Sequence, residues 1–187
     1  MNILVSYSEI ALKSRPVRSR LEQQMANQIG FMLKRSGYYG FSVNRRFGRI
    51  IVEDIPGEAA EHVARVFGTV SAMPSTRVDS DLESVVAGIA EEARRAIRDG
   101  DGFAVRPRVV GEHSYGSREV AVEGGSRVLE ALKDRGVHVN LDEPDTTIYV
   151  EVRDKDAYIY SKIVPGSASN RGDTSFYLNF CKFTIWG

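Results

Sequence analysis

The basic side chains near the start of the chain are the groups best suited to binding a ligand. Residues 1–50 hold nine lysines and arginines against two acidic residues, a net charge of +7. Residues 51–187 hold 16 basic and 23 acidic residues, a net charge of −7. Such an asymmetry indicates that a polyanion faces the basic part. A solvated surface that is merely rich in arginine explains the same counts, so charge alone leaves both interpretations open.

Seven of these nine basic residues fall into two clusters, one at the start of an expected helix and one on and beside an expected hairpin: Lys13, Arg15, Arg18 and Arg20, and then Arg45, Arg46 and Arg49. If the helix packs across the hairpin, the clusters form one positive rim. A planar guanidinium group contacts two phosphate oxygens together. Phe47 adds a ring on which an exposed base can stack. The pattern predicts contacts with nucleic-acid phosphates.

A second candidate anion site lies in the later half of the chain. Arg106 and Arg108 alternate with apolar residues in the stretch 103–110, so the two arginines share one face of an expected strand. The segment from His113 to Ser117 then leads into a helix, and a helix N-terminus preceded by glycine and hydroxyl donors is suited to an anion. An ordinary capped loop explains the same segment.

Residues for catalysis or metal binding are sparse. The sequence has no Gly-x-x-x-x-Gly-Lys-Ser/Thr, Gly-x-Gly-x-x-Gly or Gly-x-Ser-x-Gly motif. His62, His113 and His138 are far apart, which argues against a metal site. The single cysteine, Cys181, has no obvious activating neighbour and no partner for a disulfide. We therefore expect no catalytic residue, no metal and no cofactor.

The composition is ordinary for a globular chain, with 42% apolar and 27% charged residues in 187. No run approaches the ~20 apolar residues that a membrane-spanning helix needs. The first residues lack the basic start and apolar stretch of a secretory signal. A cytoplasmic protein without membrane contact is expected, and the length suits two small domains.

The first expected domain, residues 1–78, has the order β-α-β-β-α-β. Its strands and helices are expected at 2–7, 14–37, 41–46, 49–53, 58–67 and 70–78. In the long helix, apolar residues from Val17 to Met32 recur every three or four positions, which is typical of a helix packed on a sheet. The order is the ferredoxin-like pattern.

The second expected domain, residues 79–165, has the order α-β-α-β-β. Ser80 and Glu83 predict a capping box for its first helix, and Ser117 predicts the cap of a second helix that runs to Leu132. Gly124-Gly125 within that helix predicts a close approach of another helix, or else a frayed or divided helix.

The strands of this second domain are expected at 103–110, 147–153 and 156–163. Pro107 predicts that the first of them is an edge strand or carries a bulge. Residues 166–187 follow as an atypical tail, with aromatic residues crowded into its second half.

The residues from Ser8 to Ser14, Ser-Glu-Ile-Ala-Leu-Lys-Ser, resemble the opening of tRNA 4-thiouridine synthases (tRNA sulfurtransferases). In that family a Gly-Glu-Ile-Ala-Leu-Lys-like start opens a ferredoxin-like domain, and here Ser8 replaces the glycine. The second expected domain resembles the family's THUMP domain, with matching stretches at 103–113, 117–120, 139–145 and 148–158. The resemblance implies an α+β fold, a ferredoxin-like N-terminal domain followed by a THUMP α/β domain.

The resemblance also implies tRNA binding. In the family, these two domains hold tRNA and measure its acceptor region, and the THUMP domain engages the single-stranded 3′ end. The positions to which it carries contact roles are Lys13, Arg15, Arg18, Arg106, Arg108, His113, Ser117 and Arg118. Arg45, Arg46 and Arg49 are RNA-contact candidates from charge alone. Family enzymes form dimers, which makes a homodimer a further candidate assembly.

Family enzymes continue into an ATP-pyrophosphatase (PP-loop) domain with a Ser-Gly-Gly-x-Asp-Ser-like loop, and a later cysteine delivers sulfur. This sequence has neither, so we expect a recognition module that is not an enzyme by itself. One alternative is a delivery subunit for a separate catalytic chain, with the aromatic residues of 174–187 as the docking strip. Another is a ferredoxin-like dimerisation or ligand-sensing protein that binds no RNA.

Overall fold

The computed structural model describes residues 1–7, 14–46 and 48–168. In these ranges the strands join into one mixed, nine-stranded sheet in the order β2-β3-β1-β4-β8-β7-β5-β6, with β9 paired to β4. The strands are β1 Asn2–Tyr7, β2 Ser42–Arg46, β3 Arg49–Glu53, β4 Thr69–Asp79, β5 Gly102–Val110, β6 His138–Val139, β7 Thr146–Arg153, β8 Asp156–Tyr160 and β9 Val164–Pro165. The helices are α1 Arg15–Arg35, α2 Ala60–Ala64, α3 Leu82–Ala96 and α4 Ser117–Ala131, with 3₁₀ turns at Gly57–Ala59 and Lys133–Arg135.

The first half of the sheet has the expected β-α-β-β-α-β order. Helix α1 begins with Pro16 in its first turn and ends before Gly37, whose φ of 87° suits glycine. All the buried residues of α1 lie at or after Met25, so the sequence prediction that Val17 joins the buried stripe is wrong. The N-terminal half of α1, with its arginines, is therefore open to solvent.

Strand β4 belongs to both halves of the sheet. Its residues from Thr69 to Ser75 pair with β1, and those from Thr76 to Asp79 pair with β8. After β8 the chain returns to the first half, where Val164 of β9 pairs with Ala72 and packs in that core. The sequence pattern did not predict β9.

Helices α3 and α4 cover one face of the second half. At their closest approach, a Cβ added to Gly124 would lie 2.7 Å from Cδ1 of Ile89, whereas one added to Gly125 meets nothing within 4 Å. The predicted close approach is confirmed at Gly124. Strand β5 pairs with β6 only at Gly102 and Phe103, so within the described residues no strand pairs with this edge at Pro107, which suits a proline.

Both predicted helix caps of the second half are wrong by one residue. Asp81 caps α3, and its Oδ1 accepts a hydrogen bond from the Ser84 amide at 2.9 Å. Gly116 occupies the cap position of α4. Ser117 is the first helical residue, and its Oγ accepts a hydrogen bond from the amide of Val109 instead.

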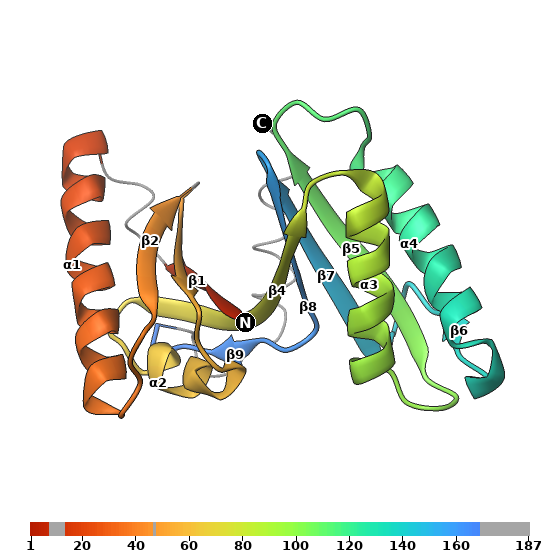
Figure 1. Cartoon of the computed structure of the whole chain (residues 1–187), viewed down its shortest axis with the longest axis horizontal. Helices are drawn as coiled ribbons and strands as arrows, with labels where there is room; N and C mark the ends of the chain where they lie inside the picture. The colour runs from red at the N-terminus through yellow and green to blue at the C-terminus, as the bar shows by residue number, and fades with distance from the viewer. Residues whose placement is uncertain (8–13, 47, 169–187) are drawn as a thin grey trace.

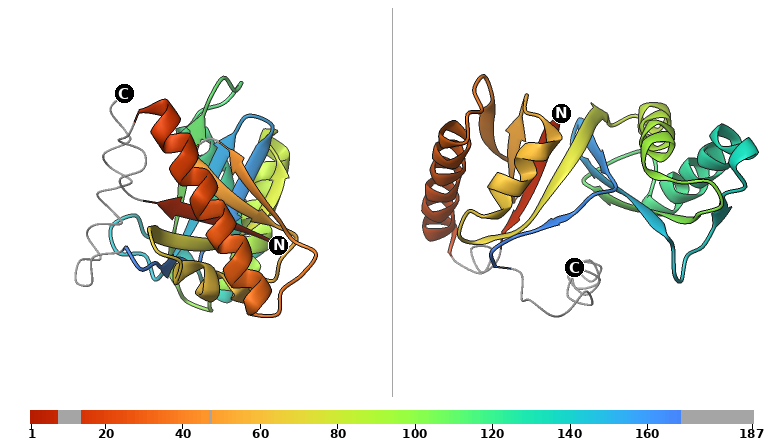
Figure 2. Two further views of the ribbon diagram at one scale, coloured as in Figure 1. Left: turned by 90° about the vertical axis from the view of Figure 1, so that its left-hand side faces the viewer. Right: turned by 90° about the horizontal axis from the view of Figure 1, so that it is seen from below.

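Helix α1 lies on one outer side of the molecule and α3 and α4 on the other, and the helix-free faces of the two half-sheets turn toward each other (Figure 1). The view from below in Figure 2 shows the same separation, with α1 on one side and α3 and α4 on the other. A small apolar cluster joins the two inner faces, and it includes Leu4, Ile51, Met73, Tyr158 and Tyr160.

Candidate nucleic-acid interface

Strand alternation decides which predicted contact residues face together. In β3, Ile50 and Val52 pack in the core under α1 and α2, so Arg49 points to the helix-free face. In β5, Phe103 and Val105 pack under α3 and α4, so Arg106 and Arg108 point to the helix-free face. The same alternation places Arg46 of β2 there. Four of the predicted residues thus belong to one continuous face.

These four arginines differ in what they contact. Arg106 is exposed, and its Nη2 donates to the carbonyl oxygen of Leu141 at 3.1 Å. Arg108 is half-buried beside it on the strand. The Arg49 side chain is only 13% exposed, with Nη2 3.1 Å from a carboxylate oxygen of Glu151. Arg49 is therefore held inside the molecule and is not an open contact residue.

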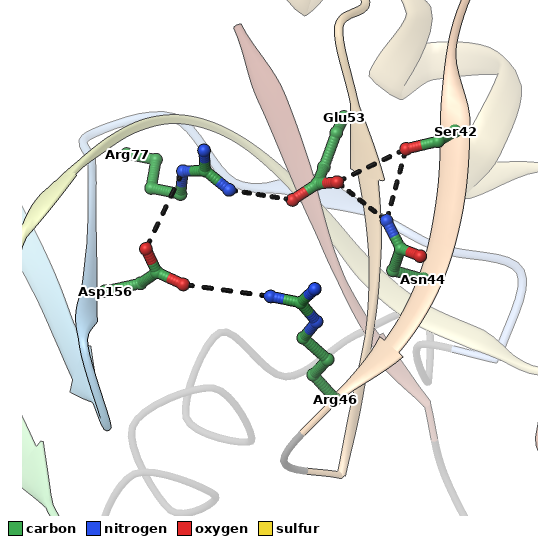
Figure 3. Close-up of polar contacts among 6 residues, drawn as sticks. All are labelled: Ser42, Asn44, Arg46, Glu53, Arg77 and Asp156. Carbon is green, nitrogen blue, oxygen red and sulfur yellow. Dashed lines mark hydrogen bonds and ion pairs between the residues drawn. The ribbon is translucent and has the colours of Figure 1, made fainter.

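A partly exposed polar network surrounds Arg46 (Figure 3). Asp156 of β8 lies 3.9 Å from Nη1 of Arg46 and 3.7 Å from Nε of Arg77. Arg77 also reaches Glu53, which accepts a further hydrogen bond from Asn44 at 2.7 Å. The acidic residues compensate part of the positive charge of this face and link its two halves.

A second basic surface is an open groove between α1 and β2. Its volume is about 720 Å³, and it is lined by Pro16, Ser19, Arg20, Gln23, Gln24, Asn27 and Arg45. Arg45 points to α1, where its Nη1 donates to the Ser19 carbonyl oxygen at 2.9 Å. Gln23 donates to Asn27 at 2.9 Å. The groove therefore combines two guanidinium groups with side-chain amides, which suits phosphate and hydroxyl groups.

Beside this groove, Arg15 is exposed at the first residue of α1. Arg18 Nε lies 3.9 Å from Glu22, and Glu22 also accepts a hydrogen bond from the Tyr7 hydroxyl at 2.6 Å. Burial, followed by the bond to Glu22, raises the pKa of Tyr7 above its usual range. Arg18 is thus partly neutralised. Lys13 and Phe47 lie outside the described residues.

The loop between β5 and α4 and the first turn of α4 carry the remaining predicted residues. Nε2 of His113 lies 3.2 Å from the Val110 carbonyl oxygen, and its ring lies 5.6 Å from that of Tyr115. The Tyr115 hydroxyl donates to the carbonyl oxygen of Ser80, which ties the loop to the start of α3. Arg118 is exposed in the first turn of α4.

Two family models match the chain one after the other. The model of the ThiI ferredoxin-like domain matches residues 2–72, and the model of the THUMP domain matches residues 79–162. Residues 2–72 thus form a ThiI ferredoxin-like domain, and residues 79–162 form a THUMP domain. The match confirms the resemblance and the fold class inferred from the sequence, and it assigns the α1–β2 groove to the ferredoxin-like domain and β5 to the THUMP domain.

Named relatives agree with the domain assignment. A probable tRNA sulfurtransferase of Methanosarcina acetivorans is 38% identical over 166 residues, 88% of this chain and 40% of that protein. The chain thus spans about two fifths of this relative's length. The crystal structure of PH1313 from Pyrococcus horikoshii Ot3 is similar with a TM-score of 0.76 and 30% identity, over 88% of this chain and 55% of that one.

A third similar structure is the crystal structure of a 4-thiouridine synthetase–RNA complex with bound ATP. It has a TM-score of 0.71 and 24% identity, over 88% of this chain and 42% of that one. At this level of identity, the similarity establishes a shared fold.

The ferredoxin-like domain contributes groove residues that the sequence reasoning missed. Gln23 and Gln24 lie three and four residues beyond Arg20 along α1, and Asn27 lies four and three residues beyond these two. That spacing puts them on one side of the helix, away from the buried stripe. The same helical periodicity that predicted the apolar face therefore carried the signal for this polar face.

Two negative findings concern only the described residues. No group of three or more His, Cys, Asp or Glu side chains in residues 1–7, 14–46 and 48–168 is arranged to hold a metal ion. In the same part of the chain, no helix is both long enough and apolar enough to cross a membrane.

Proposed function

We propose that this chain is a tRNA-binding recognition module whose two domains together hold the acceptor region and the single-stranded 3′ end. The observation that carries the proposal is the exposed Arg106 on a THUMP-domain strand, where it shares the helix-free face with Arg108. The relatives named tRNA sulfurtransferase support the choice of tRNA over other polyanions.

The chemistry of both basic surfaces suits RNA. An A-form helix offers a deep, narrow major groove that side chains cannot enter, so proteins contact its phosphates, its 2′-hydroxyls and its unpaired ends. In this proposal the α1–β2 groove, with Arg20 and Arg45, binds backbone phosphates of the acceptor stem. The side-chain amides of Gln23 and Asn27 are suited to 2′-hydroxyls.

In the THUMP domain, Arg106, Arg108 and Arg118 bind the phosphates of the 3′ single strand. The His113 ring, beside Tyr115, is a stacking partner for an unpaired base. The Ser117 oxygen already accepts a backbone hydrogen bond, but its hydroxyl hydrogen remains a donor for the RNA. Arg49 is left out of this surface because its guanidinium group is buried against Glu151.

Fluorescence anisotropy tests the proposal on a tRNA acceptor minihelix with and without its single-stranded 3′ end, at two salt concentrations. We expect tight, salt-sensitive binding that depends on the 3′ end. The double variant Arg106→Ala/Arg108→Ala should weaken binding by at least about tenfold, as expected for two lost phosphate contacts. Binding no better than that of a neutral polymer would contradict RNA recognition.

The matched control is Arg94→Ala/Arg127→Ala. It removes the same charge from the outer helices α3 and α4, where both side chains are about half exposed. Circular dichroism should show both double variants folded. If the control loses as much affinity as the Arg106/Arg108 variant, binding follows net charge, and the proposed THUMP surface is wrong.

A further inference from the structure

A buried charge cluster joins the two domains and is not used by the proposed RNA surface. Glu151 of β7 accepts hydrogen bonds from Arg153 through Nε at 3.0 Å and Nη2 at 2.9 Å, on one carboxylate oxygen. Its other oxygen accepts from Arg49 at 3.1 Å and from the Tyr160 hydroxyl at 3.3 Å. Three of these residues belong to the THUMP domain, and Arg49 belongs to the ferredoxin-like domain.

Arg49, which makes the contact between the domains, is also held by a hydrogen bond within its own domain. Nη1 of Arg49 donates to Oγ of Ser6 in the neighbouring strand β1 at 3.2 Å. Glu151 is 5% exposed and Arg153 is 8% exposed. A buried ion is tolerated only when its counter-charges are in place. Any change in the angle between the domains would separate Arg49 from Glu151, so the buried Arg49 guanidinium group would lose its carboxylate partner while Glu151 kept only Arg153 as a counter-charge.

Among the described residues, the other contacts between the domains include the pair of Arg46 with Asp156 at 3.9 Å, in which the Arg46 side chain is 49% exposed. Strand β4 runs through both domains, but a single strand can bend and twist. The apolar cluster between the inner faces is small. The ion pair of Lys162 with Glu61 also crosses between the domains, but its side chains are 64% and 54% exposed, so water and salt screen it. The Arg49–Glu151 pair differs from these exposed ion pairs in being buried, so water screens it less.

We propose that Glu151, with Arg49 and Arg153, is a positioning element that fixes the angle between the two domains so that both engage one RNA molecule. This inference rests on the proposed function. Two linked binding surfaces reinforce each other only when their geometry allows simultaneous contact. Restricting the angle before binding also removes an ordering cost from the binding step. The cluster acts without touching RNA.

The inference predicts an effect that depends on the length of the RNA. Arg49→Met removes the bond between the domains and leaves the Glu151–Arg153 pair intact within the THUMP domain. We expect it to weaken binding of the minihelix with its 3′ single strand by about tenfold or more. Binding of the isolated single strand, which the THUMP domain contacts alone, should stay within about twofold. Lys162→Met, which breaks the exposed pair, should leave both affinities unchanged.

Two outcomes would overturn the inference. In one, Arg49→Met binds the minihelix as tightly as the wild type. In the other, a folded Arg49→Met variant loses affinity for both RNAs equally, since the residue would then act on the binding surface itself. Glu151→Gln provides a second variant of the same cluster, and it should show the same dependence on RNA length.

Small-angle X-ray scattering of the free chain tests the fixed angle without RNA. The radius of gyration of Arg49→Met should exceed that of the wild type and of Lys162→Met, because the domains sample wider angles. Identical scattering from all three would contradict a positioning role. A wild-type chain that binds neither RNA would refute the proposed function, whereas the scattering result would still decide whether the cluster fixes the angle.

Discussion

Nη2 of Arg49 lies 3.1 Å from Oε1 of Glu151 across the inner faces of the two half-sheets, although 102 positions separate the two residues in the chain. Burial alone would raise the pKa of Glu151 above its usual value of 4.5, but the charges of Arg49 and Arg153 lower it to about 2. The attraction of the two guanidinium groups thus exceeds the desolvation of the carboxylate. The pair that joins the domains is therefore ionised throughout the physiological range.

The free energy of unfolding should depend on pH because this carboxylate titrates differently in the folded and unfolded states. Glu151 titrates near 4.5 when unfolded and near 2 when folded. Its contribution is therefore complete above about pH 4.5 and is lost as the pH falls toward 2. At pH 7, Glu151→Gln should lower the free energy of unfolding by roughly 3 kcal/mol, the size expected for a broken buried pair. Urea titrations from pH 7 to 2.5 measure the difference, which should shrink with acid. A difference independent of pH would contradict the assignment.

The packing of α3 on α4 gives a prediction with an adjacent control. Gly124→Ala would place a Cβ 2.7 Å from Cδ1 of the fully buried Ile89. Overpacking of this kind costs about 1–3 kcal/mol. Gly125→Ala meets nothing within 4 Å and should gain up to about 1 kcal/mol from helix propensity. Thermal unfolding should shift down for the first variant and up for the second. Equal shifts in the unfolding temperature would show that position 124 does not limit how closely α3 and α4 pack.

Most of the fold could be predicted because it follows from local periodicity. The stripe of apolar residues in α1, the alternation along β5 and the glycine-bounded hairpin of β2 and β3 are all visible within short windows. The sharing of β4 between two half-sheets was not visible, since alternation identifies a strand but not its neighbours. The two-residue strand β9 is too short for any pattern. The sequence misplaces the N-caps of α3 and α4 by one residue. Adjacent residues look equally suitable as caps, and the backbone conformation at the start of the helix decides which of them takes that position.

The candidate site could be predicted only in part, because contacts between distant strands leave no local sequence pattern. Alternation correctly put Arg106 and Arg108 on one face. A count of charges marked Arg49 as a contact candidate, yet its partner Glu151 comes from a distant strand and compensates its charge. Sequence identifies which residues are charged, whereas tertiary structure decides which charges are already paired. Arg49 is therefore left out of the proposed surface, whereas the exposed Arg106 belongs to it.

Neutralising Asp156 should strengthen RNA binding. This carboxylate lies 3.9 Å from Arg46 and 3.7 Å from Arg77 on the inner face. Asp156→Asn releases Arg46 from this carboxylate, leaves Arg77 paired with Glu53 and raises the local positive potential. The affinity for the minihelix should therefore rise a few-fold at low salt, on the order of one added phosphate contact. Glu130→Gln on the outer side of α4 makes the same change in net charge and should have little effect. Anisotropy compares the two variants. Equal gains would show that only net charge matters.

The salt dependence of binding can locate the stem contacts on α1. If about six phosphates are neutralised, wild-type affinity should fall by roughly 10³ between 50 and 200 mM salt. Arg20 is exposed in the α1–β2 groove, so Arg20→Ala should weaken binding to all stems alike and reduce the slope of log affinity against log salt by about 1. Lys34→Ala removes an equal charge from the last turn of the same helix, outside the groove, and should leave the slope unchanged. An unchanged slope in Arg20→Ala would show that the RNA does not contact the groove, because a phosphate contact cannot be lost without a change in counterion release.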